Sequence, residues 1–91
     1  MADQRRIVRF TGSVQGVGFR FTACRVAQRF AVTGTVRNCH DGSVECVVEG
    51  EAKEIDAFIA ELAEAMAGYI RSHTSEIAPH TGEYSTFTVG F

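Results

Sequence analysis

The stretch TVRNCHDGSVECVVE, residues 35–49, decides the fold, because it holds two strand-like segments around a tight turn. Residues 35–39 and 43–49 mostly alternate apolar with polar side chains, as strands with one buried face do. Between them, His40-Asp41-Gly42 has the composition of a hairpin turn. The sequence therefore predicts two antiparallel strands in the middle of the chain.

The register of this hairpin depends on the length of its loop. A two-residue turn would place Val36 and the apolar residues of the second strand on opposite faces. A three-residue loop with Gly42 in the left-handed conformation shifts the pairing by one, so that these residues share a face and Arg37 lies opposite Glu45. Because this register buries more apolar surface and pairs opposite charges, we predict it. It also puts Asn38 on the core-side face.

Upstream of the hairpin, a strand, a loop and a helix follow one another. Residues 5–12 alternate apolar with polar side chains, which predicts a strand, and residues 13–18 form a loop with two glycines. Residues 19–31 carry apolar side chains at helical spacing, namely Ala23, Val26, Ala27 and Phe30. This part of the chain is therefore predicted to lead from a strand through a glycine loop directly into a helix.

Downstream of the hairpin, residues 52–66 form the clearest helix, with an apolar face made by Ile55, Phe58, Ile59, Leu62 and Met66. Residues 69–78 predict a polar strand, and after a loop the alternation of Phe87, Val89 and Phe91 predicts one short strand more. The order is βαββαβ with an extra short C-terminal strand. It indicates an α+β, ferredoxin-like two-layer sandwich with a mostly antiparallel sheet, in which residues 1–91 form a single domain.

Composition limits the possible partners and location. The chain has 91 residues and a formal net charge of −2, so no positive field attracts nucleic acid. Neither a membrane-spanning run of roughly 20 apolar residues nor a signal peptide is apparent, which predicts a cytoplasmic protein without a membrane partner. The cysteines Cys24, Cys39 and Cys46 lack the spacing of a zinc site, so we expect reduced thiols and no metal or cofactor.

The run GSVQGVGFR, residues 12–20, joins the first strand to the first helix and is the candidate anion site. Glycines let successive N–H groups converge, and the helix N-terminus adds unpaired donors and partial positive charge. Arg20 adds a forked donor that matches two phosphate oxygens. The residues expected to contact substrate beside it are Gln15, Gly16, Val17, Gly18 and Phe19. On spacing alone, a structural glycine turn with a surface arginine explains the run equally well.

Asn38 favours the anion-binding interpretation. In this fold the first two strands run parallel, so both end at the same edge of the sheet and the glycine loop approaches Asn38. A buried amide at that place needs hydrogen-bond partners, and a bound water with a phosphate would provide them. The alternative is an asparagine that only caps loop amides.

These residues carry a family resemblance. The run at 12–20, followed by GTVRNCHDGSV at residues 34–44, resembles the acylphosphatase family over nearly the whole chain. The resemblance implies metal-independent hydrolysis of a small acyl phosphate without a cofactor. We also expect a monomer. Arg20 and loop N–H groups would bind phosphate, Asn38 would hold the attacking water, and the water's proton would pass to the substrate's own phosphate. Ala31, Thr35 and Tyr69 depart from residues that are frequent in the family.

Two other functions are compatible with the fold. The loop is also similar to the N-terminal domain of large carbamoyltransferases that mature hydrogenases, which suggests a non-catalytic or weakly active module that binds phosphate or carbamoyl phosphate. Against it, the chain ends at Phe91 without a further domain. An RNA-binding ferredoxin-like domain would display aromatic side chains on its central strands. Residues 43–49 contain none, so we do not favour RNA binding.

Overall fold

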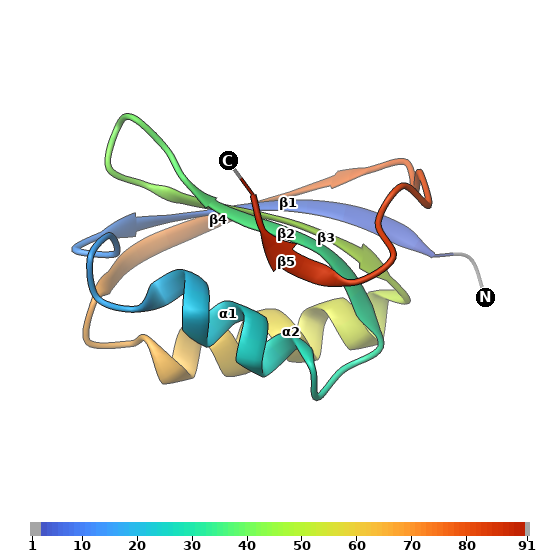
Figure 1. The fold of residues 1–91 in the computed structure, drawn as a ribbon, viewed down its shortest axis with the longest axis horizontal. Helices are drawn as coiled ribbons and strands as arrows, with labels where there is room; N and C mark the ends of the chain where they lie inside the picture. The colour runs from blue at the N-terminus through green and yellow to red at the C-terminus, as the bar shows by residue number, and fades with distance from the viewer. Residues whose placement is uncertain (1–2, 91) are drawn as a thin grey trace.

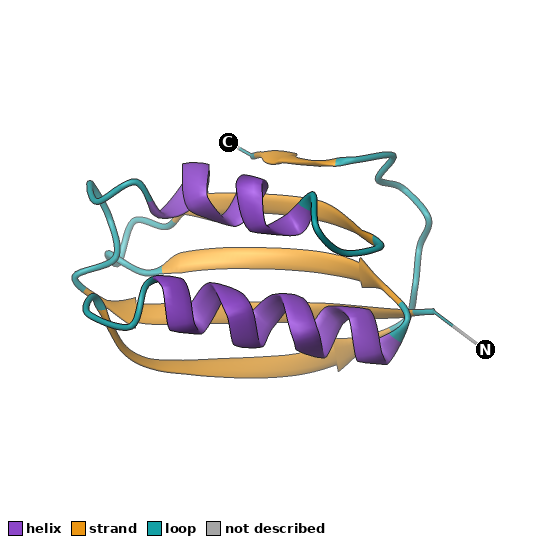
Figure 2. Ribbon diagram, turned by 90° about the horizontal axis from the view of Figure 1, so that it is seen from below, coloured by secondary structure: helices purple, strands orange, loops and turns teal. Residues whose placement is uncertain are grey.

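The computed structural model describes residues 3–90. Its elements are β1 (Gln4–Gly12), α1 (Phe19–Ala27), β2 (Val32–Asn38), β3 (Val44–Gly50), α2 (Ala52–Ala65), β4 (Ile70–Ala78) and β5 (Phe87–Val89). Both helices lie side by side on one face of a single sheet (Figures 1 and 2). This arrangement confirms the two-layer α+β prediction. Phe91, expected in the last strand, lies outside the described residues.

The order of strands explains why the glycine loop and Asn38 lie close together. Across the sheet the strands run β4-β1-β3-β2-β5, and within residues 3–90 the pairs are antiparallel except for the parallel pair of β2 and β5. Because β1 and β2 are both antiparallel to β3, they point in the same direction. Gly12 and Asn38, their last residues, therefore lie at the same edge of the sheet, as predicted.

The hairpin adopts the predicted register. Arg37 pairs with Glu45 and Val36 pairs with Cys46, while Gly42 has a φ of 93°. The Arg37 Nε donates to Glu45 Oε1 at 3.0 Å, so the expected charge pair forms on the outer face of the sheet. Burial of the apolar residues of both strands against the helices therefore decides the register, as the sequence indicated.

The first helix is shorter than predicted. It ends at Ala27 rather than at residue 31, and β2 begins at Val32 rather than at residue 35. After the helix, the N–H groups of Arg29 and Phe30 each donate to the carbonyl three residues earlier, which is the tighter 3₁₀ pattern. Phe30 still packs against the core from this turn. The spacing therefore placed Phe30 correctly on the core side. Spacing alone, however, does not distinguish a last helical turn from a 3₁₀ turn.

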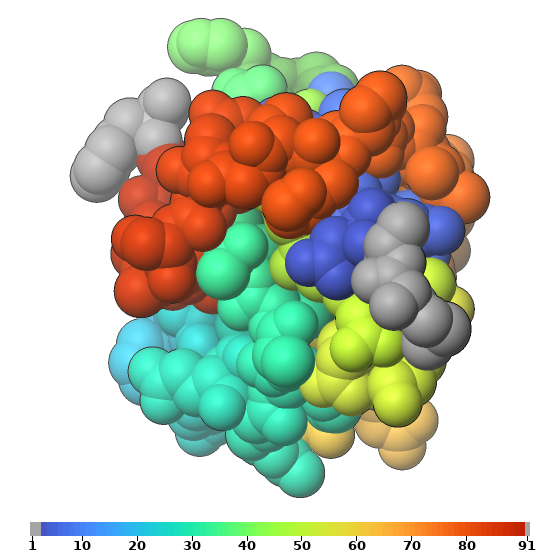
Figure 3. Space-filling view, turned by 90° about the vertical axis from the view of Figure 1, so that its right-hand side faces the viewer, coloured from blue at the N-terminus to red at the C-terminus, as the bar shows by residue number. Residues whose placement is uncertain are grey.

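A buried carboxylate holds the connection between β4 and β5. This connection passes across the end of the sheet from one edge to the other (Figure 3). Glu49, only 1 % exposed, accepts hydrogen bonds from the Thr81 N–H at 3.0 Å, the Thr81 hydroxyl at 2.8 Å and the Gly82 N–H at 2.9 Å. Arg5 Nη1 lies 3.2 Å from the same carboxylate. Glu49 thus anchors the segment that carries β5 to its place beside β2.

Glu49→Gln is expected to lower the free energy of unfolding at pH 7 by roughly 2 kcal/mol, because hydrogen bonds to a charged acceptor are lost. Burial alone would raise the pKa of Glu49, but hydrogen bonds from Thr81, Gly82 and Arg5 outweigh it and hold the pKa below its ordinary value. A carboxylate with a lowered folded pKa stabilises the protein above its unfolded pKa and stops doing so as the pH falls through the folded value.

The difference between wild type and Glu49→Gln should therefore be complete at pH 7 and shrink below about pH 4. Urea denaturation at both pH values measures it. Glu64→Gln, at an exposed position on α2, is the matched control and should change little. Equal midpoints for Glu49→Gln and wild type at pH 7 would show that the carboxylate does not anchor the connection.

Candidate active site

The loop from β1 to α1 presents a row of backbone donors. Gly16 and Gly18 both have a φ of 78°, and a Cβ at either would meet nothing within 4 Å, so the backbone angle rather than space calls for glycine. Ser13 N–H donates to the Tyr69 carbonyl, and Thr22 N–H donates to the Gly18 carbonyl. Within residues 3–90, the N–H groups at positions 15–20 have no acceptor. Unpaired donors at a helix N-terminus are suited to an oxyanion.

The structure brings Arg20 and Asn38 into one cleft. Arg20 is the second residue of α1 and is exposed, while Asn38 is the last residue of β2 and is half-buried. Both line a cleft of about 420 Å³, together with Gly16 and Gly18 of the loop. Two polar side chains from separate elements therefore meet beside the row of backbone donors.

The Asn38 amide is free to take a ligand. Among the residues that the structure describes, its side chain makes no hydrogen bond, so it does not cap the amides of the glycine loop. Its place is set by the backbone, because β2 pairs with β3 on one side and with β5 on the other. An amide held by its strand but without a protein partner can orient a small molecule in the cleft.

Gln15 was expected to contact the substrate, but its side chain binds the backbone of the hairpin instead. Its Nε2 donates to the carbonyls of Cys39 at 2.7 Å and Ser43 at 2.9 Å, so the side chain ties the glycine loop to the hairpin that carries Asn38. Its backbone N–H has no acceptor among the described residues and remains available to a substrate. The sequence does not indicate this bridge, because the bridge joins segments that are distant along the chain and neither segment carries a pattern that points to the other.

The apolar residues of the loop fix it to the core. Val14 is fully buried and Phe19 is 2 % exposed, with the Phe19 ring 5.1 Å from that of Phe10. Val17 packs against the same core. The side chains of Val17 and Phe19, both predicted at the site, therefore anchor the loop, and their backbone N–H groups are left without an acceptor among the described residues.

Two apolar residues of the cleft, Phe21 and Val89, were not predicted at the site. Phe21 follows Arg20 on α1 and is 70 % exposed, yet it lines the cleft, as does Val89 of β5. The sequence carries one sign of this position, because Phe21 is an aromatic residue that lies off the apolar stripe of its helix. Val89 could not be placed there without knowing that β5 pairs with β2.

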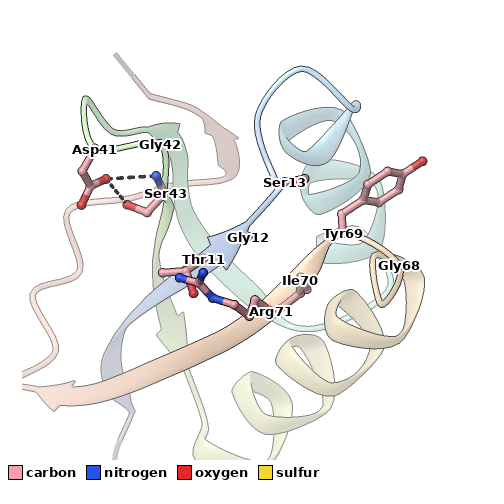
Figure 4. A pocket seen from close by; sticks show the side chains of 10 residues that line it. All are labelled: Thr11, Gly12, Ser13, Asp41, Gly42, Ser43, Gly68, Tyr69, Ile70 and Arg71. Carbon is pink, nitrogen blue, oxygen red and sulfur yellow. Dashed lines mark hydrogen bonds between the residues drawn. The ribbon is translucent and has the colours of Figure 1, made fainter.

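A second and larger cavity, of about 570 Å³, lies beside the same hairpin (Figure 4). It is lined by the end of β1, the turn around Asp41 and the start of β4, including Arg71. Asp41 is already engaged, because Ser43 donates to it from its hydroxyl and its N–H, and these bonds hold the pKa of Asp41 below its ordinary value. Neither Arg20 nor Asn38 lines this cavity, so the smaller cleft is the candidate site.

Other candidate features were also located. Within residues 3–90, no three His, Cys, Asp or Glu side chains are grouped so that they could hold a metal ion. Cys24, Cys39 and Cys46 are free thiols, and burial raises the pKa of Cys24 and of Cys46. Neither helix in the described part of the chain is long and apolar enough to cross a membrane.

Comparison with known proteins identifies the family of this chain. The Acylphosphatase family model matches residues 6–89. An acylphosphatase of Paenarthrobacter aurescens (strain TC1) is 41% identical, and the alignment covers 98% of each chain. An acylphosphatase structure from Coxiella burnetii has a TM-score of 0.83 at 29% identity, over 97% of this chain and 93% of that one. A full-length HypF crystal structure has a TM-score of 0.81 at 28% identity, over 99% of this chain but 12% of that one. With nearly its whole length matched by the family model and by a relative well above 30% identity, the chain belongs to the acylphosphatase family.

Proposed function

We propose that this chain hydrolyses small acyl phosphates to a carboxylate and inorganic phosphate in the cleft between the glycine loop and Asn38. One observation carries the proposal. The Arg20 guanidinium, the N–H groups at positions 15–20 and the Asn38 amide have no protein partners among residues 3–90. Arg20, Asn38 and the loop residues Gly16, Gly18 and Phe19 line the same cleft. Membership in the family supports the same reaction.

The phosphoryl group would be held by positive charge and backbone donors. Arg20 can bind two phosphoryl oxygens with its fork, while the loop N–H groups and the N-terminus of α1 bind the others. Phosphoryl transfer depends mainly on positioning and on charge compensation at these oxygens. The loop does not need to move for this, because Val14, Phe19 and the Gln15 bridge already hold it.

Asn38 would hold the attacking water. The water oxygen bonds to phosphorus while the bond from phosphorus to the carboxyl oxygen breaks, and the electron pair leaves with the carboxylate. A carboxylic acid has a pKa of about 4 to 5, by analogy with Asp and Glu side chains, so its anion leaves without a general acid. Among the described residues, no carboxylate or imidazole side chain lines the cleft, and the water's proton would pass to a phosphoryl oxygen of the substrate.

Hydrolysis of benzoyl phosphate tests this function. We expect turnover that is unchanged by excess EDTA, because Arg20 and the loop N–H groups supply the charge compensation that a divalent cation supplies elsewhere. Steady-state rates with and without chelator measure it. Loss of activity on chelation, with recovery on addition of a divalent cation, would contradict the proposed chemistry.

The alternative is a non-catalytic or weakly active module that binds phosphate or carbamoyl phosphate, which the similarity to part of HypF favours. The same assay separates the two functions. A binding module would bind phosphate yet show no turnover of benzoyl phosphate above the uncatalysed rate. A monomeric state and a cytoplasmic location stay predictions from the sequence. Sedimentation of the purified chain would test the first.

A further inference from the structure

Phe21 is the largest exposed apolar side chain at the cleft, and the core does not account for it. Its side chain is 70 % exposed, whereas the apolar face of the same helix, with Ala23 and Val26, is buried. It lines the cleft directly after Arg20. An apolar ring that a protein keeps in water beside a polar site is suited to contact a ligand.

The lining of the cleft combines a polar set and an apolar set of groups. At the glycine loop it offers Arg20, backbone donors and the Asn38 amide, whereas Phe21, Cys24 and Val89 make the remaining wall apolar. Phe21 and Cys24 are three residues apart on α1, so they lie on the same side of the helix. An acyl phosphate has the same division, because a dianionic phosphate is joined to an acyl group of variable size.

The position of Phe21 fits the direction in which the leaving group departs. In-line displacement places the leaving group opposite the attacking water. Asn38, the proposed ligand of that water, is half-buried, whereas Phe21 in the lining of the same cleft is 70 % exposed. A substrate whose phosphate sits on the loop would therefore direct its acyl group outward, past the Phe21 ring.

A cation also lies over the Phe21 ring and favours one orientation of it. The Arg25 guanidinium, one helical turn further along α1, lies 5.9 Å from the centroid of the Phe21 ring. This is within the distance at which a cation is attracted to an aromatic face. A ring whose orientation is restrained loses less conformational entropy when it binds a flat or branched apolar group.

From these observations we propose that Phe21 is a specificity-determining residue, and that the cleft selects acyl phosphates with an aromatic or bulky apolar acyl group over acetyl or carbamoyl phosphate. The proposal rests on the proposed function, since it assigns the acyl end of the same substrate. Phe21 makes no contact with the phosphoryl group in this arrangement and acts only through its contact with the acyl group.

The test compares kcat/KM for benzoyl phosphate and acetyl phosphate in wild type and Phe21→Ala. The two substrates differ in intrinsic reactivity, so the quantity that matters is how their ratio changes between variants. An aromatic contact of about 0.5–1.5 kcal/mol corresponds to a fall in the benzoyl-to-acetyl ratio of roughly two- to twelve-fold in Phe21→Ala. Phe21→Tyr keeps the ring and should retain most of the wild-type ratio.

Ile77→Ala is the matched control, because Ile77 is similarly exposed, at 66 %, but lies on β4 away from the cleft. It should leave the ratio unchanged. An unchanged ratio in Phe21→Ala would overturn the proposal. Binding constants for benzylphosphonate and methylphosphonate, measured without turnover, distinguish failure of the proposed function from failure of the proposed Phe21 contact. If neither acyl phosphate is hydrolysed but Phe21→Ala selectively weakens benzylphosphonate, the proposed function fails while the apolar contact stands.

Discussion

Arg20→Ala is expected to lower kcat/KM for an acyl phosphate by at least a hundred- to a thousand-fold, which is the typical cost of removing one donor aimed at developing charge. The loss should be this large because Arg20 has no protein partner among residues 3–90, so its charge is available to the phosphoryl group. Inorganic phosphate should become a much weaker inhibitor in parallel. Arg20→Lys should recover part of the phosphate affinity, since it keeps the charge but loses the forked geometry.

Arg71→Ala is the matched control for Arg20→Ala. Arg71 is also an exposed arginine near the hairpin, but it lines the larger cavity rather than the cleft. Its loss should change turnover and phosphate inhibition little. A folded Arg20→Ala variant that kept most of its turnover and its phosphate inhibition would remove Arg20 from the site. A large effect of Arg71→Ala alone would move the site to the other cavity.

Asn38→Ala is expected to lower kcat on the order of a hundredfold while leaving competitive inhibition by phosphate nearly intact. The split follows because the Asn38 amide would orient the water rather than bind the phosphate. The variant should also unfold at nearly the same denaturant concentration as wild type, since the side chain makes no hydrogen bond within the described chain. The measurements are kcat, the phosphate inhibition constant and a urea denaturation curve.

Gln15→Ala provides the contrasting pattern. The Gln15 amide does hold the loop, through its bonds to the carbonyls of Cys39 and Ser43. Its removal should weaken phosphate binding and lower stability together, as expected of a positioning residue. If Asn38→Ala instead behaved like Gln15→Ala, with parallel loss of turnover, phosphate affinity and stability, Asn38 would be part of the scaffold. Unchanged kcat would remove it from the reaction altogether.

Local sequence patterns determined the order of elements, the hairpin register and the placement of Arg20 and Asn38. Each of these depends on a short-range rule. Alternation of apolar residues defines a strand face, a glycine permits a left-handed turn at Gly42, and a loop that leads into a helix leaves N–H groups unpaired. Once the order of elements was known, the common direction of β1 and β2 brought the loop and Asn38 to one edge of the sheet.

Only the tertiary structure decided the contacts between segments that are distant along the chain. The Gln15 bridge, the anchoring of Thr81 and Gly82 by Glu49, and the pairing of β5 with β2 join such segments. A side chain's sequence neighbours do not specify which remote carbonyl or amide it will meet, because that depends on how the two layers pack. For the same reason the sequence does not place Phe21 in the lining of the cleft, since the wall of the cleft forms only after α1 has packed beside β2 and β5.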